Sequence, residues 1–248
     1  MIDAVPAPFF SIITVVRNAA NTIEDCIQSV EDQSFADFEY IVIDGLSDDG
    51  TSEIISERIA SIDTYVREKD AGLYDAMNKA LAMCRGRYVG IINADDAYFQ
   101  DTLLNVQKVL LEHPRSQIVY GGVQILSAEG SSLFVDHANL DRSMIAHPSC
   151  FVSADTYRQL GNFDTSFKIA ADYDFMLRAL KAGAVFHNSG LLLAKYRPGG
   201  TSAKNRFRSI QEMISIQANY LGWSKFYRNY RLFRYTAVTY LKPRARSR

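Results

Sequence analysis

Short apolar segments separated by helical patterns fill the first hundred residues, and this alternation restricts the fold more than any other feature. Four segments rich in β-branched or aromatic residues are predicted strands, namely residues 9–16, 40–43, 64–67 and 88–92. The first is almost continuously apolar, which is typical of a strand covered on both faces in a parallel sheet. Such strands are joined through right-handed crossovers, and their sheets bind ligands at the carboxyl ends of the strands.

The segments between these strands have the spacing of amphipathic helices. Helices are predicted from about residue 23, from residue 54, and over 73–84, 103–111 and 172–181. Beyond residue 111 the pattern loosens into strand-like runs at 118–126 and 133–135, which indicates a mixed second half. We therefore predict an α/β domain over residues 1–203, with a nucleotide-binding half at about 8–100 and an acceptor half at about 101–203. Residues 204–248 form a basic, aromatic, helical extension.

Charge is distributed unevenly along the 248 residues, although the net charge is only -1. From residue 204 onward eleven Lys and Arg residues face a single acid, Glu212. A basic, aromatic, amphipathic segment suits an anionic membrane surface, so we expect residues 219–248 to make a peripheral membrane contact. A solvated helix face is the simpler interpretation. Nucleic acid is not an expected partner, because no recognition motif accompanies the basic residues.

Cysteine usage and hydropathy predict where the protein works. Cys26, Cys84 and Cys150 lie far apart among apolar neighbours, which predicts buried thiols. No charged-then-apolar leader begins the chain, and no apolar run approaches the roughly 18 residues of a membrane span. We expect a cytoplasmic protein, with a peripheral position on the inner face of the cytoplasmic membrane if the basic segment binds there.

Carboxylates follow two of the predicted strands where they end. Asp95 and Asp96 come directly after the strand at 88–92, and Asp44 follows the strand at 40–43. An Asp pair alone is common in surface turns, but hard carboxylate oxygens in this position suit Mg²⁺ or Mn²⁺ that also binds a diphosphate. Asp44 can accept hydrogen bonds from a base or ribose, or it can belong to the turn that Asp48, Asp49, Gly50 and Thr51 form.

Two acids near the start of the helix at 172–181 need separate explanations. Asp172 and Asp174 are two residues apart and cannot share a helical face. One can cap the helix, and the other is free to act as a general base. His147 and His187 could contact acceptor or metal, although a lone histidine is more often structural.

Five ordered blocks over roughly the first 180 residues resemble glycosyltransferase family 2, of the bacterial kind that builds polysaccharide or lipopolysaccharide. The blocks are residues 11–18 (SIITVVRN), 41–51 (IVIDGLSDDGT), 70–79 (DAGLYDAMNK), 93–96 (NADD) and 171–174 (ADYD). The resemblance implies a GT-A fold, a Rossmann-like, mostly parallel sheet with a mixed acceptor half. It also implies inverting transfer from a nucleotide diphosphate sugar, expected to be a UDP-sugar, to a hydroxyl of a sugar or lipid-linked sugar.

The resemblance also assigns residues to roles. It implies donor contacts from the side chains at Thr14, Arg17, Asp44, Asp70, Asn78 and Asp95. Asp95 and Asp96 are implied as ligands of a divalent ion, and Asp172 matches the base. Residues 196–202 (YRPGGTS) resemble a late family segment near the donor phosphates, and a plain turn is the alternative.

The sequence departs from the family pattern at two positions, and two alternative functions have to be weighed against a glycosyltransferase. Asn93 replaces the first carboxylate of the usual metal motif, and Gly45 stands where many relatives have a second acid. A sugar-phosphate nucleotidyltransferase would want a glycine-rich loop after the first strand, where this chain has Arg17 and Asn18. A non-catalytic nucleotide-sugar-binding protein that docks on membranes is the third possibility, and it would have no use for a base at Asp172.

Overall fold

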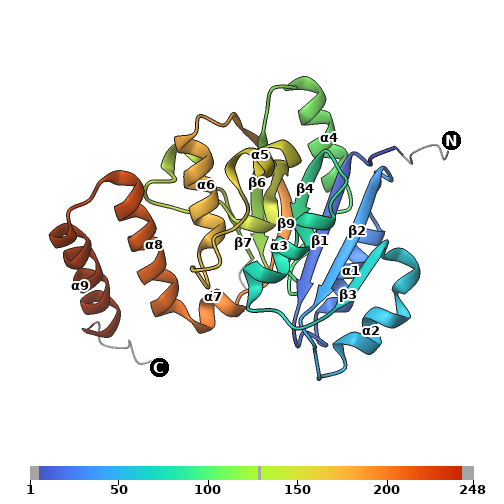
Figure 1. Cartoon of the computed structure of the whole chain (residues 1–248), viewed down its shortest axis with the longest axis horizontal. Coiled ribbons are helices and arrows are strands. Elements are labelled where there is room, and N and C mark those ends of the chain that lie inside the picture. The colour runs from blue at the N-terminus through green and yellow to red at the C-terminus, as the bar shows by residue number, and fades with distance from the viewer. Residues whose placement is uncertain (1–5, 128–129, 242–248) are drawn as a thin grey trace.

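The structure is a computed structural model that describes residues 6–127 and 130–241, with side chains described up to residue 236. A central twisted sheet carries helices on both faces, and the last two long helices stand side by side at one end of the molecule (Figure 1). Four basic residues of the predicted extension, at positions 242, 244, 246 and 248, lie outside the described residues.

The sheet begins with the parallel strands that the sequence predicts and continues with mixed ones. Its strands are β1 (Phe10–Val16), β2 (Phe38–Asp44), β3 (Thr64–Arg67), β4 (Tyr88–Ile91), β5 (Ala97–Tyr98), β6 (Ile118–Ile125), β7 (Ser131–Leu133), β8 (Cys150–Ser153) and β9 (Phe186–Tyr196). Within the described ranges their order is β3-β2-β1-β4-β8-β6-β9-β5, with β7 paired to β6. Strands β1 to β4 pair in parallel, whereas β8 runs antiparallel to β4 and β6. The predicted α/β fold with a mixed second half is confirmed.

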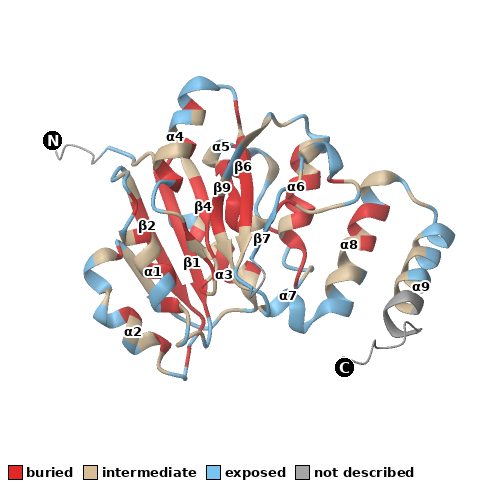
Figure 2. Ribbon diagram, turned by 180° about the vertical axis from the view of Figure 1, so that it is seen from behind, coloured by how far each residue is buried: buried red, intermediate tan, exposed pale blue. Residues whose placement is uncertain are grey.

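The helices divide between the two faces. They are α1 (Ile23–Glu31), α2 (Thr51–Glu57), α3 (Leu73–Met83), α4 (Thr102–Glu112), α5 (Ala154–Leu160), α6 (Ala171–Lys181), α7 (Thr201–Lys204), α8 (Arg206–Leu221) and α9 (Lys225–Leu241), with short 3₁₀ turns η1 (Ile59–Ser61), η2 (His137–Asn139) and η3 (His147–Ser149). One core joins α3, α5 and α6 to the sheet, and the other joins α1, α2 and α4. Figure 2 shows the resulting buried strands between partly exposed helices. Cys26 and Cys150 are buried as predicted, and Cys84 is partly buried.

Helix α8 packs against α6 and contributes the fully buried Ile216 to the core. Its Glu212 carboxylate accepts hydrogen bonds from the backbone N–H groups of Ile169 (2.8 Å) and Ala170 (3.1 Å), which precede α6. The expectation that an aspartate caps this helix is wrong, because Ala170 is the N-cap and no side chain bonds from that position. A carboxylate from α8 neutralises the helix end instead. The domain division at residue 203 stays a prediction.

Candidate functional site

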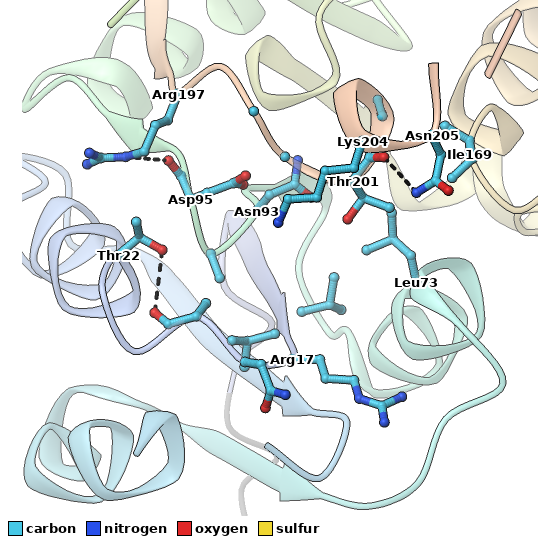
Figure 3. A pocket seen from close by; sticks show the side chains of 18 of the residues that line it. Arg17, Thr22, Leu73, Asn93, Asp95, Ile169, Arg197, Thr201, Lys204 and Asn205 are labelled. Atoms are coloured by element: carbon cyan, nitrogen blue, oxygen red, sulfur yellow. Dashed lines mark hydrogen bonds between the residues drawn. The ribbon is translucent and has the colours of Figure 1, made fainter. Parts of the chain in front are cut away.

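A cleft of about 790 Å³ opens at the carboxyl ends of β1 and β4. Its walls come from the residues after these strands, from the start of α3, and from the segment that links β9 to α8 (Figure 3). The side chains that matter to the argument are those of Arg17, Asp70, Asn93, Asp95, Arg197 and Lys204. The cleft therefore lies at the sheet edge where parallel sheets bind ligands.

The two carboxylates after β4 have different surroundings. Asp95 lines the cleft, and burial raises the pKa of its carboxyl group. Asp96 is only 2% exposed and accepts hydrogen bonds from the backbone N–H of Arg197 (3.0 Å) and from the side-chain amide of Asn93 (3.3 Å). Burial raises the pKa of Asp96 to about 7, and the charge of Asp95 acts in the same direction. Asp95 is thus the carboxylate that faces the cleft, and Asp96 anchors the loop.

The segment after β9 closes over Asp95. A Cβ atom on Gly200 would lie 2.6 Å from Oδ2 of Asp95, so any larger residue there would push the Asp95 carboxylate aside. Arg197 donates from Nε to the backbone oxygen of Asp95 at 3.3 Å (Figure 3). Its Nη2 donates to Asp25 Oδ2 at 3.0 Å. All residues of the glycine segment at 196–202 line the cleft. A contact of this segment with donor phosphates stays a prediction.

Oxygen ligands for a divalent ion are available in this cleft, although they are few. Within residues 6–127 and 130–241 no group of three or more His, Cys, Asp or Glu side chains is arranged to hold a metal. Asn93 Oδ1, however, is buried without a hydrogen-bond partner among these residues, and its side chain lines the same cleft as Asp95. Mg²⁺ and Mn²⁺ accept one or two protein oxygens and complete their shells with phosphate and water. These residues fit such an ion.

A smaller inner pocket of about 50 Å³ adjoins the cleft and contains Asp172. Both cavities are lined by Leu73, Asn93, Ile169, Thr201 and Ser202, so they lie next to each other. Asp172 lies in the first turn of α6, and the Tyr74 hydroxyl donates to its Oδ1 at 2.8 Å. Asp174 points elsewhere and bonds with Tyr220 and Arg178, so the two acids occupy separate faces as predicted.

Asp44 does not line the cleft. Its carboxylate is fully buried and accepts hydrogen bonds from the backbone N–H and hydroxyl of Ser47 and from Arg67. Asp70 and Arg17 do line the cleft. A Cβ atom on Gly45 would lie 2.0 Å from Asp70 Oδ2, so glycine after Asp44 makes room for the Asp70 carboxylate.

Three further predicted residues lie away from the cleft. Thr14 is fully buried and shares a hydrogen bond of 2.9 Å with Tyr40. Asn78 holds both backbone polar groups of Phe163. His187 stacks on His113, with ring centroids 3.8 Å apart, and lines neither cavity. His147, in contrast, lines the inner pocket with Asp172.

Positive charge dominates the cleft lining. Five basic residues contribute to it against two acids, Asp70 and Asp95; the basic ones are Arg17, Lys168, Arg197, Lys204 and Arg208. Arg197 pairs with Asp25 and Arg208 with Glu212, whereas Arg17, Lys168 and Lys204 form no ion pair in the part of the chain that the structure describes. Figure 3 shows Lys204 reaching toward the wall that carries Asn93, and Arg17 on the opposite side. The cleft can therefore attract an anion.

Sequence reasoning missed three contributors to this site. Tyr74 lies inside one of the five family-like blocks, but its hydroxyl carries no signal of its own. Lys204 falls within the predicted extension, although it lines the cleft. The sequence does carry a signal for Glu212, because a single acid among eleven cations is unusual and indicates a specific partner.

Comparison with known proteins defines the class of enzyme. Residues 11–169 match the family described as glycosyl transferase family 2. The chain is 29% identical over 215 residues to the PGL/p-HBAD biosynthesis glycosyltransferase of Mycobacterium bovis BCG, covering 84% of this chain and 81% of that protein. It is also 25% identical over 240 residues to an uncharacterized glycosyltransferase of Rickettsia felis, covering 88% of this chain and 38% of the other. The protein is a glycosyltransferase, and the chain belongs to glycosyl transferase family 2.

Solved structures agree on the fold. TarS 1–349 of S. aureus in complex with UDP-GlcNAc superposes with a TM-score of 0.72 at 17% identity, covering 96% of this chain and 74% of that one. The mannosyltransferase PcManGT of Pyrobaculum calidifontis in complex with GDP-Man and Mn²⁺ gives 0.70 at 21% identity, covering 90% and 68%. The predicted GT-A fold is confirmed.

Proposed function

We propose that this glycosyltransferase moves a sugar from a nucleoside diphosphate sugar to a hydroxyl acceptor in a single inverting step. One observation carries the proposal. Asp172 lines an inner pocket that shares wall residues with a wide cleft, and most of the charged side chains in that cleft are basic. A base beside an anion-binding cleft is what displacement of a diphosphate by a hydroxyl requires. Membership of a glycosyltransferase family weighs against the nucleotidyltransferase alternative.

The donor diphosphate is assigned to the wide cleft. Arg17 and Lys204 lie on different sides of it and form no ion pair among residues 6–127 and 130–241, so both can neutralise phosphate oxygens. We propose a UDP-sugar as donor, with a GDP-sugar as the alternative to be tested beside it. TarS and PcManGT were solved with UDP-GlcNAc and GDP-Man respectively, and both share this fold.

A divalent ion, Mg²⁺ or Mn²⁺, is assigned to Asp95, with Asn93 Oδ1 and Asp96 as the neighbouring oxygens. When bound, such an ion offsets the negative charge that grows on the departing diphosphate. Burial raises the pKa of Asp95 because it disfavours the charged carboxylate, and an adjacent cation would favour that charged form again. Of these three residues Asp96 is the least available to the ion, because both of its carboxylate oxygens already accept hydrogen bonds.

Asp172 is assigned as the general base. Its carboxylate takes the proton of the acceptor hydroxyl while that oxygen forms a bond to the anomeric carbon and the bond from this carbon to the diphosphate breaks. A single displacement of this kind inverts the anomeric configuration. Tyr74 donates to Oδ1 at 2.8 Å, so it orients the carboxylate and leaves Oδ2 for the acceptor.

The assignment of Asp172 is tested by release of nucleoside diphosphate. We expect wild-type protein to turn over a UDP- or GDP-sugar with Mn²⁺, and Asp172→Asn to lower kcat by about 10²- to 10⁴-fold. The matched control is Asp155→Asn, an exposed aspartate of α5 that pairs with Arg158 and should keep full activity. Turnover that Asp172→Asn leaves unchanged would leave the non-catalytic binding alternative in place.

We also propose that α9 brings the enzyme to an anionic membrane, where a lipid-linked acceptor would lie. No helix in the described ranges is long and apolar enough to cross a bilayer. Phe226 and Phe233 are nevertheless 84% and 71% exposed, and they share one helical face with Tyr230. Lys225, Arg228, Arg231 and Arg234 lie on the same helix and supply the charge.

Sedimentation with lipid vesicles tests this contact. Wild-type protein should bind vesicles that contain phosphatidylglycerol and not vesicles of phosphatidylcholine alone. The double variant Phe226→Ser, Phe233→Ser should lower the affinity at least about tenfold, because each buried Phe contributes roughly 1.5–3 kcal/mol. Equal binding by wild type and variant would contradict a role for α9.

A further inference from the structure

His147 is half-buried, but both of its ring nitrogens are buried and have no partner in the described part of the chain. Both are inaccessible to solvent, and neither makes a hydrogen bond there. Buried polar atoms in folded proteins are almost always hydrogen-bonded, so an imidazole with both nitrogens unsatisfied needs a specific explanation. Because such a group lowers the stability of the fold, a purely structural role explains it poorly.

The position of this imidazole is set firmly by its neighbours. His147 begins the short turn η3, and the Ser149 hydroxyl lies 2.8 Å from the backbone oxygens of both Gly121 and Ala146, which share its single hydrogen. The ring packs edge-on against Phe163, with centroids 6.0 Å apart. Asn78 in turn holds Phe163 through both of its backbone polar groups. The ring is thus held in place by packing, while its two nitrogens have no hydrogen-bond partner among the described residues.

His147 lines the inner pocket together with Asp172, Tyr74 and Asn93. This pocket measures about 50 Å³. A single water molecule needs roughly 10–15 Å³ of such space, so the pocket has room for a hydroxyl and the carbon that bears it. Asp172 disfavours an anionic group in so small a space, and therefore the fitting ligand is a neutral alcohol.

We propose that His147 binds the acceptor, its imidazole forming a hydrogen bond to a hydroxyl group of a sugar acceptor beside Asp172. The inference rests on the proposed function of Asp172. Burial lowers the pKa of His147, although the charge of Asp172 acts in the opposite direction. A neutral imidazole keeps one donor and one acceptor nitrogen, so it can pair with a hydroxyl in either sense without neutralising the Asp172 carboxylate.

Acceptor kinetics with methyl glycosides of glucose, mannose and rhamnose provide the first test. Glycosides that fit should accelerate release of nucleoside diphosphate from the donor by wild-type protein. For His147→Phe we expect the half-saturating glycoside concentration to rise about tenfold, as loss of one hydrogen bond predicts, while that of the nucleotide sugar stays the same. His147→Asn, which keeps a polar side chain, should recover part of the loss. His187→Phe is the matched control and should resemble wild type.

Thermal unfolding of the ligand-free protein provides a second test that needs no acceptor. If His147 is retained for a ligand, an apolar side chain of similar size should relieve the unsatisfied nitrogens, so His147→Phe or His147→Leu should raise Tm. A lower Tm for both variants, or unchanged glycoside saturation in His147→Phe, would overturn the proposal. Failure of wild type to turn over any donor would count against the proposed function instead, and the Tm comparison would still decide the role of His147.

Discussion

Buried polar groups at the two ends of the parallel strands differ in whether they have hydrogen-bond partners. At the amino end, Glu39 is 3% exposed and accepts hydrogen bonds from the Ser11 hydroxyl (2.6 Å), from the Arg85 backbone N–H (2.6 Å) and from Arg85 Nε (2.7 Å). At the carboxyl end, Asn93 Oδ1 and both nitrogens of His147 have no partner among the described residues.

This difference separates the part of the sheet that stabilises the fold from the part that binds. Buried polar groups with complete partners make a region rigid, whereas unsatisfied ones reduce stability and are kept where a ligand completes them. Asp44 lies at the carboxyl end but has complete partners, so it belongs with the stabilising groups despite its position. Tyr98 and Arg228 also carry a buried polar atom without a partner among the described residues, but they line neither cavity, so both location and missing partners are needed to indicate a binding residue.

Asp95→Ala should lower activity more than any other single change in the wall of the wide cleft. Loss of the carboxylate that faces the cleft should lower turnover of the nucleotide sugar by about 10²-fold and raise the Mn²⁺ concentration needed for half-maximal activity. Steady-state rates across a Mn²⁺ titration measure both quantities. Asp155→Ala is a suitable control, because that exposed side chain pairs with Arg158 and lines neither cavity. A rate equal to wild type would place the metal elsewhere.

Glu39→Gln should affect stability and leave the cleft intact. Burial by itself raises the pKa of Glu39, but hydrogen bonds from Ser11 and Arg85 outweigh it and hold the pKa below 4.5. A lowered carboxyl pKa stabilises the fold above the unfolded value and loses this contribution as pH falls through the folded value. We expect the variant to lose about 2 kcal/mol of unfolding free energy at neutral pH.

Urea unfolding at neutral pH and at a pH well below 4.5 checks this sign, because the gap between wild type and Glu39→Gln should narrow in acid. A gap that widens in acid would contradict the assignment. The variant should still turn over donor at the wild-type rate, since Glu39 lies at the other end of the sheet from the cleft.

Glu212→Gln should lower the stability of the fold by less than Glu39→Gln does. Burial raises the pKa of Glu212, yet hydrogen bonds from the backbone N–H groups of Lys168, Ile169 and Ala170 and from Arg208 lower it overall. Loss of this charged cap should cost about 1 kcal/mol of stability, as for other helix caps. Chemical unfolding measures it, with Arg208→Gln to separate the ion pair from the cap. No change in either variant would show that α8 does not support the start of α6.

Asn93→Asp should have the smallest effect of these variants, and it should strengthen Mn²⁺ binding where Asp95→Ala weakens it. A carboxylate in place of the unsatisfied amide oxygen adds a charged ligand, so the Mn²⁺ concentration for half-maximal activity should fall about tenfold or less. The same substitution removes the amide that donates to Asp96 at 3.3 Å, so stability should decrease slightly. A higher Mn²⁺ requirement would count against Asn93 as a neighbour of the ion.

Local patterns predicted β1, β3, β4, α3 and α4 to within about one residue at each end, because each has its own apolar run or stripe. Strand β2 and helix α2 begin two and three residues earlier than predicted. The sequence could not orient Thr14, since a strand buried on both faces has no alternation to tell its two sides apart. The cap of α6 was equally hidden, because Glu212 comes from another helix about 40 residues later. The unsatisfied atoms of Asn93 and His147 depend on every surrounding group, so only the folded structure reveals them.

Anomalous scattering from crystals grown with Mn²⁺ and a nucleoside diphosphate tests the central claim most directly. The account predicts a manganese peak beside the Asp95 carboxylate, with the diphosphate between Arg17 and Lys204. A peak remote from Asp95, or a diphosphate bound outside the cleft at the carboxyl ends of β1 and β4, would contradict it.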